Sequence, residues 1–337
     1  MSNVKSWTYT TAGYPETLQL HDTQVPAEPA PNHILVEVKA AALNPVDIQM
    51  MNLFVNSLPG FQATKIVGRD LAGVVLAAAP GTSFEKGDEV MGVTMAFDGS
   101  GTLTEVVHVD MGSSCLVKKP QHMTWTQAAS LPLVWLTAYT SIEKCTPFMK
   151  KSNPADNKIV ILGGSSATGI YSIWLARERG WHVLTSCSSR NSGFVKERGA
   201  NEVVDYTTSP NAVKEAVTAF KPDAIVDCVG GTECIGLAPK YVTIVGDKTS
   251  RSTMGGSFLY LVSPRMVLRW LLGYFGLGKS YECIILAQEK KWLEKAADLK
   301  DNNIVIDSVF EFGKGKEAYE RLNTSRARGK VVVKLSD

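Results

Sequence analysis

Short runs in which apolar and polar residues alternate fill the first third of the chain. Residues 33–43, 71–81, 84–93 and 103–110 each contain such a run, and glycine or proline separates them. A period of two places successive side chains on opposite faces of a strand, while glycine and proline mark turns. Residues 1–125 are therefore predicted to form a β-rich, barrel-like domain.

The pattern changes from about residue 125 onward. Residues 124–145 read as two helical pieces broken near Pro132, and helical stretches then separate apolar, strand-like runs. The runs are 158–164, 182–187, 203–206, 224–230 and 241–246, and a helix at 292–303 and a strand at 329–335 follow them. Strands that alternate with helices are typical of a parallel sheet covered by helices.

These two patterns predict an α/β protein with two domains. Residues 126–304 would form a doubly wound parallel sheet of the Rossmann type. The barrel-like domain would be discontinuous, with residues 1–125 and about 305–337, because a last strand follows the helical region.

One apolar run, residues 258–278, is nearly long enough to cross a bilayer. Pro264, Arg265 and Arg269 interrupt it, and an arginine at the centre of a bilayer is costly. Because Arg265 and Arg269 are four residues apart, they would share one face of a helix. We expect a helix that is buried in the protein or in an interface, with at most a peripheral contact to lipid.

The composition is that of an ordinary globular chain. Of 337 residues, 45% are apolar and 20% are charged, and a net charge of +2 gives no reason to expect a nucleic-acid partner. The six cysteines include no CxxC pair, so neither a disulfide framework nor a cysteine-built zinc site is predicted. The start of the chain lacks an apolar signal core and an Arg-rich presequence, from which we expect a cytoplasmic location.

A glycine-rich turn follows the strand-like run at 158–164. Gly164, Ser166 and Gly169 occupy the places of a G-x-G-x-x-G fingerprint, with serine as the middle residue and Gly163 added in front. The fingerprint is weak alone, but its place between a strand and a helix is typical of a dinucleotide site. The residues predicted to bind the cofactor here are Gly163, Gly164, Ser165, Ser166, Ala167, Thr168 and Gly169.

The end of the second strand in this series indicates which dinucleotide binds. A carboxylate there would bind the ribose 2′-hydroxyl of NADH and repel a 2′-phosphate. The sequence has Ser186, Cys187 and Ser188 instead, followed by Arg190, whose guanidinium suits phosphate oxygens. We therefore predict NADPH as the cofactor, although Arg190 could also be a solvated residue at the start of a helix.

Other strand ends extend the predicted cofactor site, because open parallel sheets bind nucleotides at the carboxyl ends of their strands. Tyr206, after the third strand, could stack near the adenine or could simply pack. The fourth and fifth strands end where backbone would meet the ribose and the nicotinamide, and the residues concerned are Cys228, Val229, Gly230, Val245 and Gly246.

The chain resembles the medium-chain dehydrogenase/reductase superfamily, in its zinc-independent branch of quinone and enoyl reductases. The order and spacing of several motifs carry this resemblance over nearly the whole chain. They are AAALNPVDIQM (40–50), VGRDLAGVV (67–75), FEKGDEVMG (84–92), AASLPLVWLTAY (128–139), the glycine turn, ERGANEVVDY (197–206) and GKVVVKL (329–335). The resemblance implies a GroES-like N-terminal domain, a Rossmann domain and a substrate cleft between them.

Zinc-dependent members of the superfamily hold a catalytic metal through positions that match Asn44, Arg69 and Leu133 here. None of these three residues is a plausible zinc ligand, so the resemblance implies an enzyme without a metal. Without a Lewis acid, the implied reaction is hydride transfer from NADPH to an α,β-unsaturated carbonyl or a quinone.

The resemblance also implies roles for single residues. Asn44 would be a catalytic amide donor near the nicotinamide, unless it only caps a turn. Asp47 would orient Asn44, or would form a structural ion pair with Arg69. Thr137 and Lys330 would lie near the cofactor, with a buried helix threonine and a solvated strand-edge lysine as the alternatives.

Apolar residues near Asn44 are predicted to bind a hydrophobic small-molecule acceptor. They are Met50, Met51, Phe54 and Phe61, together with the run at 258–278, and the alternative is that many of them are core residues. Some enoyl reductases of this branch place a catalytic tyrosine about ten residues after the asparagine, where this chain has Phe54 and Val55. Water or the cofactor ribose would then deliver the proton.

Two other functions remain open from the sequence. One is a biosynthetic enoyl reductase that acts in trans on a carrier-bound chain. The other is a protein that binds NADPH without catalysis, as a sensor or scaffold, since the tyrosine and the middle glycine are missing. The resemblance further implies a homodimer, with residues 241–246 and 258–278 in the contact region.

Overall fold

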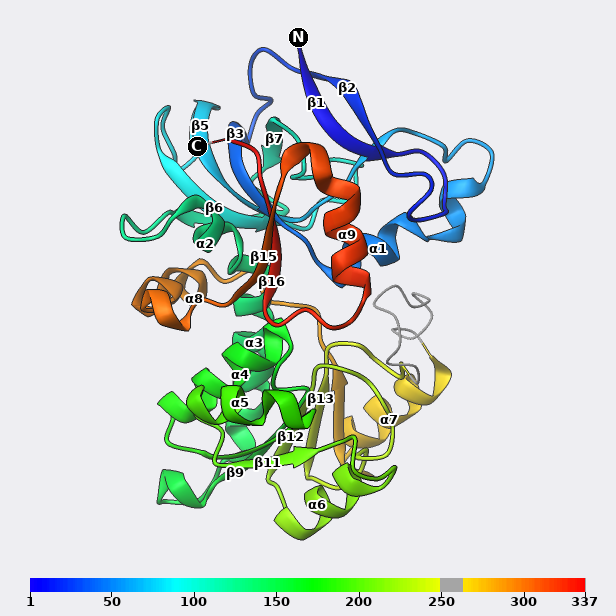
Figure 1. Ribbon diagram of the computed structural model, residues 1–337, viewed down its shortest axis with the longest axis vertical. Coiled ribbons are helices and arrows are strands. Elements are labelled where there is room, and N and C mark those ends of the chain that lie inside the picture. Colours follow the sequence, from blue (N-terminus) through cyan, green and yellow to red (C-terminus); the bar gives the residue numbers. More distant parts are fainter. Residues whose placement is uncertain (249–262, 337) are drawn as a thin grey trace. The chain divides into compact units, whose positions relative to one another are not determined.

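The computed structural model describes residues 1–248 and 263–336 (Figure 1). Over these residues the chain divides into two compact units, each with its own hydrophobic core. Unit 1 contains residues 1–133 and 288–336, and unit 2 contains residues 134–248 and 263–287. Both ends of the chain therefore belong to unit 1.

A fully parallel sheet forms the centre of unit 2, as the alternation of strands and helices predicted. Its described strands lie in the order β11-β10-β9-β12-β13-β14. They are β9 (Lys158–Leu162), β10 (His182–Cys187), β11 (Glu202–Asp205), β12 (Ala224–Asp227), β13 (Lys240–Thr243) and β14 (Ser280–Cys283). The chain runs outward from β9 to β11 and returns to β12 on the other side of β9. The strand order therefore reverses between β9 and β12.

Helices connect the strands of unit 2. They are α3 (Pro132–Cys145), whose first two residues belong to unit 1, α4 (Ala167–Glu178), α5 (Ser192–Glu197), α6 (Ala212–Phe220) and α7 (Pro264–Tyr274). The predicted break near Pro132 is confirmed, because a short helix ends at Ala129 before α3 begins. Val217 and Phe220 of α6 share a core with Val160 and Ile225 of the sheet.

Strand β14 is an addition to the sheet that the sequence did not indicate. It pairs with β13 along its whole length, so β13 lies between β12 and β14. The run at 241–246 is therefore not the edge of the described sheet, and its predicted place in a contact between two copies is not tested. The homodimer itself stays a prediction.

Helix α7 is not buried within the chain, which was one of the two alternatives predicted for the apolar run at 258–278, and burial in an interface is not tested. Residues 258–262 lie outside the described part of the chain. In α7, Met266 is buried, whereas most of the apolar side chains are exposed to solvent. No helix within residues 1–248 and 263–336 is long and apolar enough to cross a membrane.

Unit 1 is built mainly from antiparallel strands. One sheet has the order β15-β16-β3-β5-β6-β8, with β7 also paired to β3, and a small sheet has the order β2-β1-β4. The strands are β1 (Ser2–Tyr9), β2 (Gln19–Val25), β3 (His33–Ala42), β4 (Lys65–Ile66), β5 (Asp70–Ala78), β6 (Glu89–Thr94), β7 (Val106–Asp110), β8 (Ser114–Lys118), β15 (Ile306–Glu311) and β16 (Lys330–Lys334). Val331 and Val333 of β16 share a core with Ile34 and Val36 of β3, so the chain after residue 300 does return to this unit.

The helices of unit 1 are short. They are α1 (Pro45–Met51), α2 (Trp125–Ala129), α8 (Lys290–Glu294) and α9 (Gly315–Asn323). The single helix expected at 292–303 is instead α8 followed by two 3-10 turns, Lys295–Asp298 and Asp301–Asn303.

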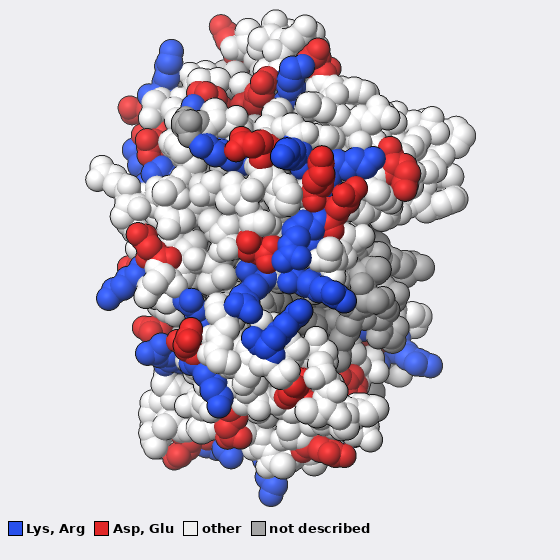
Figure 2. Space-filling view, in the orientation of Figure 1, with Lys and Arg blue, Asp and Glu red and all other residues white. Residues whose placement is uncertain are grey.

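The segment after residue 288 belongs to unit 1 rather than to the Rossmann-type unit predicted to extend to residue 304. Lys290 lies over the Phe84 ring at 5.9 Å from its centroid, and His122 is hydrogen-bonded to the Leu299 carbonyl at 3.4 Å. Basic and acidic side chains are interspersed over the face drawn in Figure 2, as a net charge of +2 leads one to expect.

Candidate functional site

Two glycines in the turn between β9 and α4, and a third in the first turn of α4, have no room for a side chain. Gly163 has a φ of +82°, and a Cβ there would overlap Val229. A Cβ on Gly164 would overlap Thr185, and one on Gly169 would overlap the carbonyl oxygen of Gly163. The backbone of the turn is therefore bare, which is what the approach of a pyrophosphate requires.

Ser166, which replaces the middle glycine of the fingerprint, caps helix α4. Its Oγ accepts a hydrogen bond from the Gly169 N–H at 3.1 Å, and its own N–H donates to the Gly163 carbonyl at 2.9 Å. Asn191 donates to Ser165 Oγ at 3.1 Å and so ties the turn to the segment after β10. The serine therefore closes the first turn of α4 without blocking the bare backbone.

The carboxyl ends of β9 and β12 meet where the strand order reverses. Gly163 follows β9 and lies against Val229, which follows β12. The buried carboxylate of Asp227 accepts hydrogen bonds from the N–H groups of Val229 (3.1 Å) and Gly230 (2.9 Å) and from the Tyr241 hydroxyl (3.1 Å). Sequence reasoning missed Asp227, although an aspartate that ends an apolar strand is a signal for such a cap. Open α/β sheets bind ligands at the point where the strand order reverses.

The remaining residues predicted along this edge differ in exposure. Cys228 is buried, and burial raises the pKa of its thiol. Val245 and Gly246 follow β13, and Gly246 has a φ of +63°. Tyr206 is half exposed after β11, whereas Thr137 is buried in α3. Tyr206 alone of these presents a large side chain to solvent.

The end of β10 bears on the predicted NADPH contact. Ser186 is buried, and its Oγ accepts a hydrogen bond from the Gly163 N–H at 3.0 Å. Cys187 is also buried, which raises the pKa of its thiol to about 11. The Ser186 side chain therefore supports the turn from within the protein, and a contact of Ser186 or Cys187 with the cofactor stays a prediction. Ser188 is half-buried and Arg190 is exposed.

A carboxylate does lie beside this segment, but it comes from the third strand. Asp205 ends β11 opposite Cys187. It accepts hydrogen bonds from the Thr207 N–H (2.8 Å) and hydroxyl (2.7 Å), and Ser189 also donates to it. These bonds hold the pKa of the Asp205 carboxyl below its usual value. This contact depends on the register of β11 against β10, so no sequence pattern indicates it.

Unit 1 contains a second group of candidate residues, a buried polar cluster around Lys330. The Lys330 ammonium donates to Asn44 Oδ1 at 2.5 Å and to Asp70 Oδ2 at 2.9 Å. Asn44 Nδ2 donates to Asp70 Oδ2 at 3.0 Å and to the Ala42 carbonyl at 3.2 Å. Asp70 Oδ1 accepts from the Leu133 N–H at 2.8 Å. Both N–H groups of the Asn44 amide are thus used inside the protein.

This arrangement bears on two roles that the sequence predicted. Asn44 has no exposed surface, and an amide donor role toward a substrate would require one of its two hydrogen bonds to be released, so that role stays a prediction. Lys330 is 2% exposed and paired with Asp70, which contradicts the solvated strand-edge alternative.

Asp47, the other predicted catalytic residue, lies beside this cluster. One carboxylate oxygen accepts from the Asn44 N–H at 2.8 Å and from the Tyr319 hydroxyl at 3.2 Å, and the other is buried without a hydrogen bond. Burial raises the pKa of Asp47 to about 6. The expected ion pair with Arg69 is not formed. Arg69 donates to the Ala96 carbonyl instead.

Replacing Asp47 with asparagine is expected to change how stability depends on pH. Because folding raises the carboxyl pKa from 3.8 to about 6, the protonated form stabilises the fold below pH 4, and this contribution is lost as the pH rises through 6. The free energy of unfolding of Asp47→Asn minus that of the wild type should therefore rise by about 2.5 kcal/mol between pH 4 and pH 7. Urea denaturation at a series of pH values measures it, and a flat difference would show that Asp47 is ionised throughout.

The polar cluster does not suit a zinc ion. The positions that hold zinc in the metal-dependent members carry Asn44, Arg69 and Leu133, and the Lys330 ammonium already supplies a cation between Asn44 and Asp70. Zinc sites are built from thiolates, imidazoles and carboxylates. Within residues 1–248 and 263–336 no three His, Cys, Asp or Glu side chains are grouped as a metal site requires.

The residues predicted to bind an apolar acceptor are exposed on unit 1. Phe54 and Phe61 are exposed, and Met50 is half-buried at the end of α1. Phe97 is exposed as well, and the Arg69 guanidinium lies 5.4 Å from its ring centroid. Phe97 was not predicted, because a single phenylalanine in a loop has no pattern that distinguishes it.

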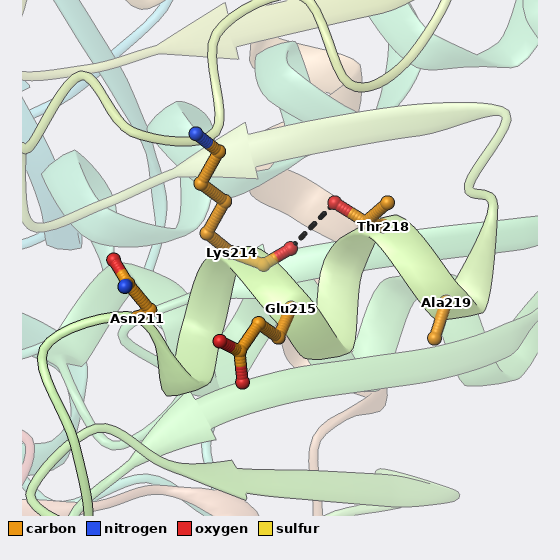
Figure 3. Close-up of a pocket in the computed structure, with 5 residues that line it drawn as sticks. All are labelled: Asn211, Lys214, Glu215, Thr218 and Ala219. Carbon is orange, nitrogen blue, oxygen red and sulfur yellow. Dashed lines mark hydrogen bonds between the residues drawn. The ribbon is translucent and has the colours of Figure 1, made fainter.

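A hollow along α6, drawn in Figure 3, contains none of the predicted site residues. Its lining residues all come from the solvent side of one helix and are Asn211, Lys214, Glu215, Thr218 and Ala219. Thr218 Oγ1 donates to the Lys214 carbonyl at 2.7 Å, as an exposed helix threonine commonly does. We assign no function to this hollow.

Two family models match the chain. The model described as an alcohol dehydrogenase GroES-like domain matches residues 30–121, which confirms the GroES-like domain expected there. The model described as a zinc-binding dehydrogenase matches residues 198–333.

Proteins similar to this chain extend the match to its whole length. The human NAD(P)H oxidoreductase RTN4IP1, mitochondrial, is 30% identical over 98% of this chain and 89% of its own length. The chloroplast envelope quinone oxidoreductase homolog of Arabidopsis thaliana is 27% identical over 93% of both chains. The solved quinone oxidoreductase from Coxiella burnetii is 24% identical, with a TM-score of 0.79 over 99% of this chain and 100% of its own.

The expected cytoplasmic location is wrong. Similar proteins from human, mouse and zebrafish are named mitochondrial, and a plant relative is named for the chloroplast envelope, which points to an organelle. The expectation was based on the lack of a secretory signal and of an Arg-rich presequence. The lack of these two signals is not positive evidence for the cytosol.

Proposed function

Because the chain belongs to the medium-chain dehydrogenase/reductase superfamily, as a member of its quinone oxidoreductase type, we propose that it is an NADPH-dependent oxidoreductase that reduces quinones or activated C=C bonds without a metal. The observation that carries this proposal is the bare glycine turn at the point where the strand order of unit 2 reverses. The polar cluster of unit 1 supports the proposal that the reaction needs no metal ion.

Gly163, Gly164 and Gly169 would let the turn approach a pyrophosphate, whose charge would face the N-terminus of α4. Asp227 keeps the adjoining Val229–Gly230 backbone in place by accepting both of its N–H groups. Bound NADPH supplies a hydride, and the hydride together with one proton from water converts a quinone to a hydroquinone. These residues of the chain bind and orient the cofactor.

A 2′-phosphate would be selected by Ser188 and Arg190. No carboxylate ends β10, and both side chains lie at the surface, where they can reach phosphate oxygens. Asp205 opposes this selection with its negative charge, although Ser189 and Thr207 already donate hydrogen bonds to it. We therefore propose a preference for NADPH that Arg190 produces and Asp205 limits.

The Lys330 ammonium supports the metal-free part of the proposal. It donates hydrogen bonds to Asn44 Oδ1 and Asp70 Oδ2, so a positive charge already lies between these oxygen atoms. Without a Lewis acid the acceptor must already be electron-poor, as quinones and α,β-unsaturated carbonyls are. The exposed rings of Phe54, Phe61 and Phe97 suit a hydrophobic acceptor of this kind.

Replacing Arg190 with alanine is expected to weaken NADPH binding by about 1.5–3 kcal/mol, or roughly 10- to 150-fold in Kd, because a charge-assisted hydrogen bond to phosphate is lost. NADH binding should change little. Fluorescence titration with both cofactors measures this, and Lys196→Ala, which removes an exposed charge from α5, is the matched control. Equal losses for NADH and NADPH would contradict the assignment.

Replacing Asp205 with asparagine is expected to have the opposite effect on the preference between NADPH and NADH. Removal of its negative charge should raise the affinity for NADPH relative to NADH, because the like-charge repulsion of a 2′-phosphate disappears. An unchanged ratio of the two Kd values would show that Asp205 does not face the bound phosphate.

A further inference from the structure

Helix α7 presents an unusually apolar surface to solvent (yellow in Figure 1). Most of the large side chains from residue 267 to residue 277 are exposed, and Tyr274 and Leu277 reach 73% and 77%. The side chains that matter most below are Leu268, Trp270, Leu271, Tyr274, Phe275 and Leu277. Isolated exposed apolar residues need no explanation, but a contiguous set of this kind marks an interaction surface.

The opposite side of α7 is fixed to the sheet of unit 2. Met266 is buried in the core that contains Tyr281 of β14. Arg269 donates to Asp247 at 2.6 Å and lies 5.2 Å from the centroid of the Tyr281 ring. A Cβ on Gly273 would come within 2.8 Å of the Lys279 carbonyl, so the helix packs closely there. The exposed side is therefore held outward by tertiary contacts.

Charge along this segment has a single sign. Between Ser263 and Tyr281 there is no aspartate or glutamate. Arg265 and Lys279 are exposed at the two ends of the apolar surface, whereas Arg269 is paired with Asp247. An apolar surface with negative charge at its rim would therefore complement this face.

We infer that the exposed face of α7 docks on an anionic lipid surface. An amphipathic helix with Trp, Leu and Phe on one side and basic residues at its margins lies in the plane of the headgroups. The Trp270 and Tyr274 rings stack at 5.6 Å, and each ring carries a polar atom that suits the boundary between acyl chains and headgroups. The eleven residues of α7 are too few to span the bilayer, so the helix lies on it.

A second copy of the chain fits this face less well. A two-fold contact sets the same patch against itself, so an antiparallel pair of α7 helices would bring Arg265 near Lys279 of the other copy. No carboxylate in the segment could pair with either charge. Anionic headgroups neutralise both, which is the reason to prefer lipid.

Vesicle flotation tests this inference with the full-length protein. The wild type should float with vesicles made of equal parts phosphatidylcholine and phosphatidylglycerol, and should bind vesicles of phosphatidylcholine alone at least tenfold less. Leu268→Ser combined with Leu271→Ser should lower the bound fraction at least tenfold. Leu76→Ser, which changes an exposed leucine of β5, should leave it unchanged.

Light scattering and turnover without lipid complete the experiment. Failure of the wild type to bind either kind of vesicle would overturn the inference. So would a loss of dimer in the Leu268→Ser/Leu271→Ser variant, since this would assign the face to a contact between copies. The inference does not depend on the proposed reaction, and lipid-free turnover of NADPH by the double variant should equal that of the wild type.

Discussion

Replacement of Lys330 with methionine is expected to lower the free energy of unfolding by about 3–5 kcal/mol, the cost of breaking a buried ion pair from one side. The side chains of Lys330 and Asp70 are 2% and 0% exposed. Methionine would leave the Asp70 carboxylate buried without a counter-charge and Asn44 Oδ1 without its donor. Denaturation with urea, followed by circular dichroism, measures the loss.

Lys118→Met is the matched control for this prediction. Lys118 and Asp88 form an ion pair of nearly the same length, 2.8 Å, but the Lys118 side chain is 70% exposed. Water and salt screen an exposed pair, so this variant should be close to the wild type in stability. If the free energy of unfolding falls by the same amount in both lysine variants, burial of the ion pair does not explain the effect of replacing Lys330.

A second variant separates charge from packing at Lys330. Asp70→Asn removes the negative charge while its oxygen can still accept the hydrogen bond from Leu133. In that background, Lys330→Met should cost at least 1 kcal/mol less than in the wild type, because no unpaired carboxylate remains. Equal costs in both backgrounds would mean that the two charges do not interact.

Replacement of Gly169 with alanine is expected to abolish most NADPH binding. The new Cβ would overlap the Gly163 carbonyl oxygen, which is backbone and cannot rotate away. Helix α4 would have to move from the turn, at a cost of about 1–3 kcal/mol, which corresponds to roughly 5- to 150-fold in Kd if the displacement falls on the binding site. Fluorescence titration with NADPH gives the affinity, and urea denaturation shows how much of the cost falls on the fold.

Gly193→Ala is the control for that experiment. Gly193 lies in helix α5, where a Cβ would meet nothing within 4 Å. Alanine there should stabilise the helix by about 0.4–1 kcal/mol and leave the affinity for NADPH unchanged. If Gly193→Ala lost as much affinity for NADPH as Gly169→Ala, this would contradict the proposed role of the glycine turn in binding the cofactor.

The regular parts of the fold could be predicted because their signal is local. Apolar alternation located β3, β5, β6 and β7, and the βα series located β9 to β13 together with the glycine turn. Strand β14 escaped because SYEC contains no apolar run, and its strand conformation depends on pairing with β13. The segment 292–303 has helical periodicity, but packing against unit 1 breaks it into shorter pieces.

The candidate sites were predicted less well, because their chemistry depends on distant residues. Asn44 and Lys330 are 286 positions apart in the sequence, and no pattern in either segment indicates that their side chains are hydrogen-bonded. The burial of Ser186 follows from its strand lying inside the sheet, which composition does not reveal. Asp205 reaches the segment after β10 through the register of β11.

The proposed reaction is best tested by measuring NADPH consumption with a panel of quinones and 2-enals. The protein would first be dialysed against a metal chelator, and Gly169→Ala would serve as the weak-binding reference. We expect steady turnover of NADPH with phenanthrenequinone or a 2-enal after chelation, and little turnover by the variant. Tight binding of NADPH with no turnover across the panel would contradict the proposed reaction, and would favour a protein that binds the cofactor as a sensor or scaffold.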